Sequence, residues 1–276
     1  MNFKKYLKAL LQKNKLWNPK TVLEKVNFLG HQLTTTAGTV RVAGDKDDAW
    51  FYELAKHKNN LLDIGCNIGF MGILAKIANP KASLILIDPN PMALEVAFKN
   101  LMLNKFTNNV NFINAFVGET PGEDIKFYAV STDASGSMYK SSAHSAAMVD
   151  SFFYVQSTTV DEICSRNKFT PDFIKVDVEG AESFVLKGSK QTALNCKPFF
   201  AVEMHGPEEM PMAKNAELVL NWCNEVAYSA YYMSTHQKLA SAQEIAHRGR
   251  CHLLLIPNDS TYPEYLRNLG EGAYLS

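Results

Sequence analysis

Two acids and two glycines between residues 60 and 91 have the types and spacing of a nucleoside-binding unit. Asp63 follows a short apolar run, and a turn with Gly65, Asn67 and Gly69 comes next. A helical pattern follows, and a second apolar run ends at Asp88. In such a strand, turn, helix and strand unit, the turn lets the backbone approach a ligand and the second acid binds ribose hydroxyls. An ordinary buried turn is the alternative.

The spacing of the turn residues indicates which kind of nucleoside the unit would bind. The dinucleotide fingerprint G-x-G-x-x-G fails, because Asn67 and Phe70 stand where the second and third glycines are needed. The pattern present, D-x-G-x-N-x-G, resembles motif I of class I S-adenosylmethionine-dependent methyltransferases. That resemblance implies that Gly65 allows close approach of the cofactor. It also implies that Asp63 reaches the amino end of the cofactor, directly or through water.

The resemblance goes beyond motif I: four segments, the first of which contains it, are together similar to the FkbM family of methyltransferases. They are LLDIGCNIGF at 61 to 70, DPNPMALEVAFKNLMLN at 88 to 104, TTVDEI at 158 to 163 joined to PDFIKVDVEGAESFVLKG at 171 to 188, and KPFFAVEMHG at 197 to 206. The most specific piece is IKVDVEGAE. One departure is Asp88, where the family more often has glutamate.

The resemblance implies a set of residues that bind S-adenosylmethionine. Asn90 belongs to the D-P-N-P segment, and either Asn114 or Ala115 would reach the adenine. Cys66 lies inside the turn and is interpreted as a small filler rather than a nucleophile. The expected cofactor-binding residues are Asp63, Gly65, Cys66, Asn67, Gly69, Asp88, Asn90, Asn114 and Ala115.

Acidic residues and a histidine follow two later strands, where a methyl acceptor would meet the cofactor. Asp177 and Glu179 come after the run FIKV, and Glu203 and His205 end the run FFAVEMH. Ligands of open α/β sheets bind beyond the carboxyl ends of the strands. Asp177 and His205 are candidates to remove the proton of an acceptor hydroxyl, with Glu179 and Glu203 orienting the substrate or the base. The same four side chains could instead hold Mg²⁺, Mn²⁺ or Zn²⁺.

The elements around these residues predict a Rossmann-like class I methyltransferase fold: a mostly parallel seven-stranded sheet with helices on both faces. The strands are expected near residues 61–62, 84–87, 110–113, 125–130, 173–176, 199–202 and 252–256. A helix is expected from residue 47 to 57, before the first of them.

Composition limits the class of protein. There are 28 basic and 28 acidic residues, so the charge balance gives no argument for a nucleic-acid partner. The five cysteines form no C-x-x-C pair, which indicates reduced thiols and a cytoplasmic setting. The sequence contains no apolar run long enough to predict a transmembrane segment.

Two regions lie outside every motif. Residues 1–45 are expected to form a helical extension of a methyltransferase domain at 46–276, with Phe3, Leu7, Leu10 and Leu11 on one helical face. That helix could dock on a membrane surface or a partner, or pack on its own domain or a second subunit in a homo-oligomer. The serine-rich segment 131–150 is either a substrate lid or a surface insertion.

The expected function is therefore S-adenosylmethionine-dependent O-methylation. From the resemblance alone, the acceptor would be a hydroxyl of a sugar, a glycan or a polyketide-like small molecule. Two alternatives are an NAD-dependent oxidoreductase, which the incomplete glycine fingerprint disfavours, and an inactive nucleoside-binding module. The intact acids and glycines disfavour the second alternative.

Overall fold

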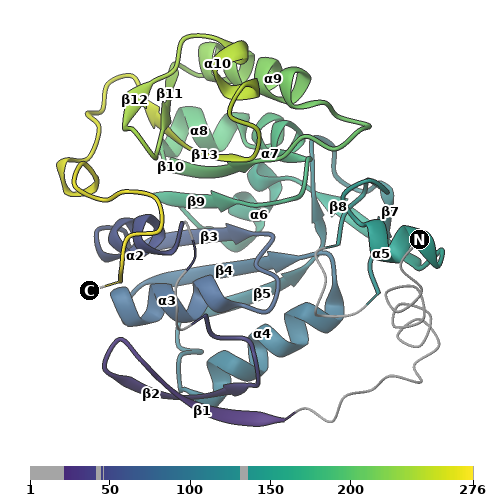
Figure 1. The fold of residues 1–276 in the computed structure, drawn as a ribbon, viewed down its shortest axis with the longest axis vertical. Coiled ribbons are helices and arrows are strands. Elements are labelled where there is room, and N and C mark those ends of the chain that lie inside the picture. Colours follow the sequence, from purple (N-terminus) through teal and green to yellow (C-terminus); the bar gives the residue numbers. More distant parts are fainter. Residues whose placement is uncertain (1–21, 42–44, 46, 131–135, 276) are drawn as a thin grey trace.

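A mixed sheet lies at the centre of the computed structural model, which describes residues 22–41, 45, 47–130 and 136–275 (Figure 1). Within these residues the sheet has eight strands. In spatial order they are β12 (Gln237–Lys238), β11 (Tyr228–Tyr232), β13 (Cys251–Pro257), β10 (Phe199–Met204), β9 (Phe173–Val176), β3 (Asn60–Ile64), β4 (Ser83–Asp88) and β5 (Val110–Asn114).

The strands from β10 to β5 are parallel, and β13 is antiparallel to β10. The central strand β3 lies between β4 and β9, so the chain leaves β3 toward one side of the sheet and returns on the other. A ligand crevice is expected at such a switch point, beyond the carboxyl ends of the strands.

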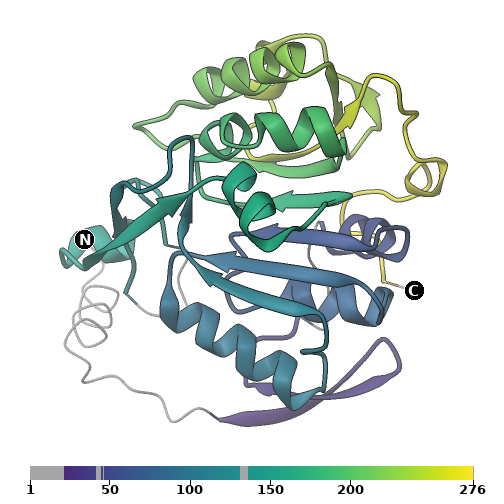
Figure 2. The ribbon, with the colours of Figure 1, turned by 180° about the vertical axis from the view of Figure 1, so that it is seen from behind.

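Helices cover both faces of the sheet, as the two opposite views show (Figures 1 and 2). Leu61 of β3 packs in one core cluster and Leu62 in the other, because successive strand residues point to opposite faces. Being buried on both faces explains why the central strands are continuous apolar runs. The helices α2 (Asp48–Lys56), α3 (Phe70–Ala78) and α4 (Pro91–Leu103) pack on the first face; α6 (Val160–Asn167), α7 (Glu182–Lys187), α8 (Lys190–Cys196), α9 (Met212–Glu225) and α10 (Ala242–Ala246) pack on the second.

A smaller three-stranded sheet lies beside the carboxyl ends of the main strands, next to the short helix α5 (Figure 1). Its central strand, β8, pairs in parallel with β6 and antiparallel with β7. The remaining bounds are β6 (Phe116–Val117), β7 (Asp124–Tyr128), α5 (His144–Met148), β8 (Phe152–Thr158) and the 3-10 helix η1 (Glu264–Leu266).

The fold class predicted from the sequence is confirmed, and the strand count needs correction. Six of the seven expected strands lie in the main sheet, whereas the run at 125–130 forms β7 of the smaller sheet. Two strands of the main sheet were missed, and β6 and β8 of the smaller sheet were not predicted either. β11, with the sequence YSAYY, has no regular polar and apolar alternation, and Tyr228 is buried there against Phe200 and Trp222. β12 consists of two exposed residues, which carry no apolar signal.

The helical extension expected over residues 1–45 is wrong for its second half. Residues 1–21, with the predicted helical face, lie outside the described residues. Residues 23–36 form an antiparallel hairpin of β1 (Leu23–Phe28) and β2 (His31–Thr36) instead of a helix. Leu29 and Gly30 connect the strands with φ angles of 48° and 76°, the left-handed pair that a tight hairpin turn requires.

The hairpin packs against α4 through backbone hydrogen bonds. The N–H groups of Thr34 and Thr36 donate to the side chains of Asn104 and Asn100 at 2.9 and 2.8 Å. The hairpin is thus attached to the body that carries the site. Among the described residues, no helix has the length and apolar character needed to cross a membrane.

Candidate active site

The turn between β3 and α3 is built on left-handed residues that bring it close to two neighbouring elements. Gly65, Asn67 and Gly69 have φ angles of 82°, 47° and 79°. A Cβ atom on Gly65 would lie 1.8 Å from the carbonyl oxygen of Asp177, and one on Gly69 would lie 2.7 Å from the Cβ of Ala97. The glycines therefore let the turn pack directly on the end of β9 and on α4.

Asp88, at the end of β4, is held by the backbone on two sides. The N–H of Asn67 donates to its Oδ2 at 2.7 Å, and the N–H of Asn90 donates to its Oδ1 at 2.8 Å. Burial raises the pKa of Asp88 to about 6. Asn90 also caps α4, since its side-chain oxygen accepts from Met92. Each carboxylate oxygen of Asp88 keeps a lone pair for a further donor.

A first pocket opens beside Asp88 at the carboxyl ends of β3 and β4. Its polar wall includes Asn67, Asp88 and Asn90, and its apolar wall includes Ala115 and Phe116. Of the two residues proposed for adenine, Ala115 lines this pocket. Asn114 does not, because its side chain donates to the carbonyl oxygens of Asp88 and Pro89 at 2.9 and 3.0 Å.

A second pocket lies on the other side of the turn, and Gly65, Asn67 and Asp177 line both pockets. The second pocket is lined by charged groups from distant segments of the chain. Cys66 also lines it, and burial raises the pKa of its thiol, which supports a filler role. The charged residues of its wall are Arg41, Asp45, Asp47, Lys175, Asp177, Glu203, Arg250, His252 and Glu271.

Asp63 lies below the turn and lines neither of these two pockets. Its side chain is 3% exposed, and neither carboxylate oxygen has a hydrogen-bond partner within the described part of the chain. Burial raises the pKa of Asp63 to about 6, although the nearby Lys175 opposes that shift. Asp63 is therefore separated from both pockets by the turn in this conformation.

Lys175 is a buried cation among carboxylates that the sequence did not single out. Its Nζ donates to Oδ2 of Asp177 at 3.0 Å. Burial alone would lower the pKa of Lys175, but Asp177, Asp63, Asp47 and Glu203 together raise it. Lys175 thus stays charged, and its ion pair with Asp177 stabilises the end of β9 among these carboxylates.

The four predicted catalytic side chains come together at the ends of β9 and β10. Nε2 of His205 lies 3.7 Å from Oε1 of Glu203 and 3.8 Å from Oε2 of Glu179. Burial alone would raise the pKa of Glu203, but His252 and Arg250 hold it well below its usual range. Asp177 lines both pockets and Glu179 lines the first. The structure therefore brings together the residues that the sequence grouped by strand end.

His205 is turned away from both pockets by a buried partner that the sequence did not identify as part of the site. Its Nδ1 lies 2.9 Å from Oε1 of Glu182, which is fully buried and also accepts from Gly180 and Asn215. Burial would lower the pKa of His205, but Glu182 outweighs this effect and raises it to about 9. A protonated, enclosed imidazole suits a role in positioning Glu179 and Glu203. The sequence signal for Glu182 was its place in IKVDVEGAE.

The described part of the serine-rich segment, residues 136–150, lies against the end of β9. The hydroxyls of Ser137 and Ser142 donate to the carbonyl oxygen of Glu179 at 3.1 and 3.3 Å. The exposed Glu209 accepts from the backbone N–H of Lys140 at 3.1 Å and from the hydroxyl of Ser141. We name these contacts of residues 137–142 the serine latch.

Replacing Glu209 should loosen the serine latch. We expect Glu209→Ala to be cleaved within residues 136–150 about fivefold faster in limited proteolysis, because losing these exposed hydrogen bonds, together worth about 1 kcal/mol, raises the open population by that factor. Glu208→Ala is the matched control, since the neighbouring residue contributes its backbone N–H rather than its side chain. Equal cleavage of both variants would show that Glu209 does not hold the segment.

The fold and the pockets define a class of protein before any comparison. An α/β sheet with an acid at the end of its second parallel strand, a glycine turn after its first, and a pocket between them is the arrangement of class I methyltransferases. The model of the methyltransferase FkbM domain matches residues 63–229, which is more than half of the chain. The chain therefore belongs to the FkbM methyltransferase family.

Solved structures resemble the chain at low sequence identity. A methyltransferase FkbM from Methylobacillus flagellatus is 16% identical with a TM-score of 0.45, and the match covers 71% of this chain and 43% of that one. An O-methyltransferase from Bacillus cereus, solved with SAH, is 8% identical with a TM-score of 0.45, and the match covers 91% and 89%. This chain thus spans less than half of the Methylobacillus protein. A search of curated proteins finds no match.

Proposed function

We propose that the chain transfers the methyl group of S-adenosylmethionine to a hydroxyl of a sugar, glycan or polyketide-like small molecule. The observation that carries this proposal is the position of Asp177, which lines both pockets. A donor in the first pocket and an acceptor in the second would meet at this carboxylate. The acceptor class follows from the resemblance to the FkbM family.

The first pocket fits the adenosine part of the donor. Asp88 can accept from ribose hydroxyls with its remaining lone pairs, and Ala115 and Phe116 offer an apolar wall to adenine. Asp63, whose oxygens have no hydrogen-bond partner among the residues the structure describes, would attract the amino end through the turn or an intervening water. When bound, the donor supplies a methyl group on a positively charged sulfur.

The second pocket fits the acceptor. Methyl transfer is an in-line displacement, so holding the hydroxyl at the correct distance supplies much of the acceleration. Asp177 would accept the proton that the hydroxyl loses, and Glu179 and Glu203 would orient the acceptor. His205 would act through those two glutamates, because it lines neither pocket. We place no cation between Asp177, Glu203 and His205, since Lys175 already pairs with Asp177 and Arg250 already pairs with Oε1 of Glu203, the oxygen that faces His205.

Asp88→Asn should weaken donor binding without abolishing the fold. Losing hydrogen bonds to a charged acceptor costs about 1.5–3 kcal/mol, which is about 10- to 150-fold in affinity. The raised pKa of Asp88, about 6, adds a pH test. Ribose hydroxyls donate to the ionised carboxylate, so wild-type affinity should fall as the pH drops from 7 to 5. Calorimetry with S-adenosylmethionine measures both the loss of affinity and its pH dependence. If the variant showed the same pH dependence as the wild type, Asp88 would not be the residue that contacts the ribose.

A ligand panel separates the proposal from its alternatives. Thermal unfolding measured with S-adenosylmethionine, S-adenosylhomocysteine and NAD should show stabilisation by the first two. Incubation with S-adenosylmethionine and sugar, glycan or polyketide-like acceptors should then release S-adenosylhomocysteine. Stabilisation by NAD alone would support an oxidoreductase, and donor binding without methyl transfer to any member of these acceptor classes would support an inactive module.

A further inference from the structure

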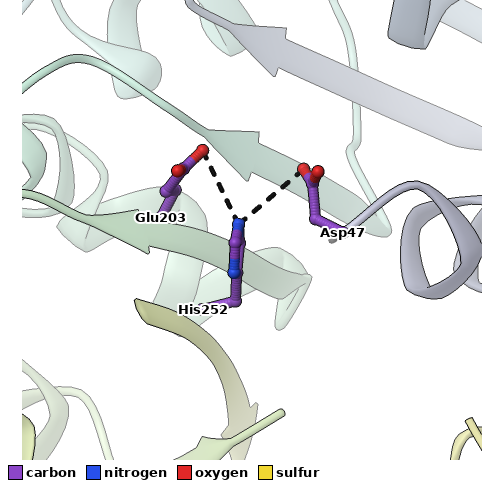
Figure 3. A group of neighbouring side chains, drawn as sticks. All are labelled: Asp47, Glu203 and His252. Atoms are coloured by element: carbon purple, nitrogen blue, oxygen red, sulfur yellow. Dashed lines mark ion pairs between the residues drawn. The ribbon is translucent and has the colours of Figure 1, made fainter. Parts of the chain in front are cut away.

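A second group of potential ligands lies on the far side of Glu203 from His205. Asp47 precedes α2, Glu203 lies on β10, and His252 lies directly opposite Glu203 on β13. Figure 3 shows the imidazole of His252 pointing between the two carboxylates. Nε2 of His252 lies 3.6 Å from Oε2 of Glu203 and 3.9 Å from Oδ2 of Asp47. The three ligand atoms all lie within 4.8 Å of one another.

Nε2 of His252 is buried and has no hydrogen-bond partner among the described residues. The distances to both carboxylates are longer than a hydrogen bond allows. They are close to the separation of about 3.3–3.6 Å that ligand atoms have around a tetrahedral cation with bonds of about 2.0–2.2 Å. A buried nitrogen aimed between two carboxylate oxygens is thus near the geometry of a metal centre.

The pairing of Glu203 favours this group over the one formed by Asp177, Glu203 and His205. Oε1 of Glu203, which faces His205, is bound by the guanidinium of Arg250. Oε2 faces His252 instead. Asp177 is likewise engaged by Lys175. Arg250 would therefore act as an outer partner that orients Glu203 from behind, as the outer shell of a metal site commonly does.

The excess of negative charge around Glu203 also favours a bound cation. Asp47, Asp63, Asp177 and Glu203 all act on Lys175, and Arg250 pairs with Glu203. Lys175, Arg250 and the protonated His205 are the cations of this region, and they stand against six carboxylates, which leaves negative charge in excess when His252 is neutral. The six carboxylates are those of Asp47, Asp63, Asp177, Glu179, Glu182 and Glu203. Because Glu203 is 5% exposed, that excess is poorly screened by water. A divalent cation would neutralise it.

We propose that Asp47, Glu203 and His252 bind a divalent cation of the Mn²⁺ or Zn²⁺ type. Two carboxylates and an imidazole suit these ions, whereas Ca²⁺ and Mg²⁺ prefer oxygen ligands alone. The three residues line the second pocket together with Asp177, so open coordination positions face the place proposed for the acceptor. The acceptor class is then narrowed to molecules that offer a metal a second oxygen beside the methylated hydroxyl. That role rests on the proposed methyl transfer; binding of the cation does not.

The test measures cation binding in the full chain without donor or acceptor. Chelator-treated protein is dialysed against Mn²⁺ or Zn²⁺ alone, and bound metal is counted by mass spectrometry. We expect the wild type to bind one metal ion per chain tightly. In His252→Gln and Asp47→Asn the affinity should fall more than about 100-fold, beyond the 10- to 100-fold cost of losing an outer partner. His57→Gln, which stacks on Tyr265 outside the group, should bind like the wild type.

Asp177→Asn and His205→Gln distinguish the two groups that share Glu203. Both variants should still bind one metal ion tightly if the cation lies with His252. Both should lose that tight binding if the cation lies with His205. Circular dichroism of each metal-free variant checks that it is folded. If His252→Gln is unfolded, Asp47→Asn alone tests the site. The proposal would be overturned if the wild type bound no metal ion tightly. It would also be overturned if the folded Asp47 and His252 variants still bound one tightly. Neither result depends on methyl transfer.

Discussion

Asp177→Asn is expected to bind S-adenosylmethionine as the wild type does and to transfer methyl groups about 10²–10⁴-fold more slowly, the usual contribution of a positioned proton acceptor. The variant keeps the size of the side chain and removes its basicity. Donor affinity should survive because the acid that we propose for the ribose is Asp88, on another strand. Calorimetry for binding and release of S-adenosylhomocysteine for turnover check the two halves separately.

Asp172→Asn, at the opposite end of β9, is the matched control. Asp172 accepts from the backbone of Asn59 and Asn60 at 2.8 and 2.9 Å, so its replacement should lower stability while leaving turnover per folded molecule unchanged. A wild-type rate in Asp177→Asn would show that the proton is removed elsewhere. His205→Ala should slow turnover less than Asp177→Asn, because His205 reaches the acceptor only through Glu179 and Glu203.

The strand, turn, helix and strand proposed to bind the nucleoside could be predicted from the sequence because their requirements are local. The glycines, Asp63 and Asp88 stand within one strand, turn, helix and strand, and each position has a backbone reason that pattern analysis can state. The strand ends of β9 and β10 were located in the same way, from short apolar runs followed by acids. Parallel pairing then necessarily placed Asp177 and Glu203 at one edge of the sheet.

The electrostatic partners could not be predicted, because they come from distant parts of the chain. Arg250 meets Glu203 across the antiparallel pair of β10 and β13, and Asp47 reaches the same acid from the start of α2. Glu182 had an ordinary explanation as an acid in the first turn of a helix. Its burial beside His205 changes the role of that histidine, and no spacing rule contains that information. The hairpin over residues 23–36 was missed since its turn, Leu29 and Gly30, is not a common hairpin pair.

Gly65→Ala should be the most damaging single-methyl change in the described part of the site. At φ +82° an L residue is strained by about 1–2 kcal/mol. The new Cβ would also lie 1.8 Å from the carbonyl oxygen of Asp177, a backbone atom that cannot move without displacing the end of β9. Overpacking of this kind adds about 1–3 kcal/mol or more. We therefore expect a much lower melting temperature and no measurable binding of S-adenosylmethionine.

Gly122→Ala separates the two contributions. Gly122 has the same φ, +82°, but nothing lies within 4 Å of the point that a new Cβ would occupy, so this variant carries the backbone strain without the collision. Calorimetric unfolding should show a loss of about 1–2 kcal/mol for Gly122→Ala and a clearly larger loss for Gly65→Ala. Donor binding should be intact in Gly122→Ala, since that glycine lies outside both pockets. Equal losses would mean that the turn can withdraw from β9 and that the predicted collision of the new Cβ with the carbonyl oxygen of Asp177 does not occur.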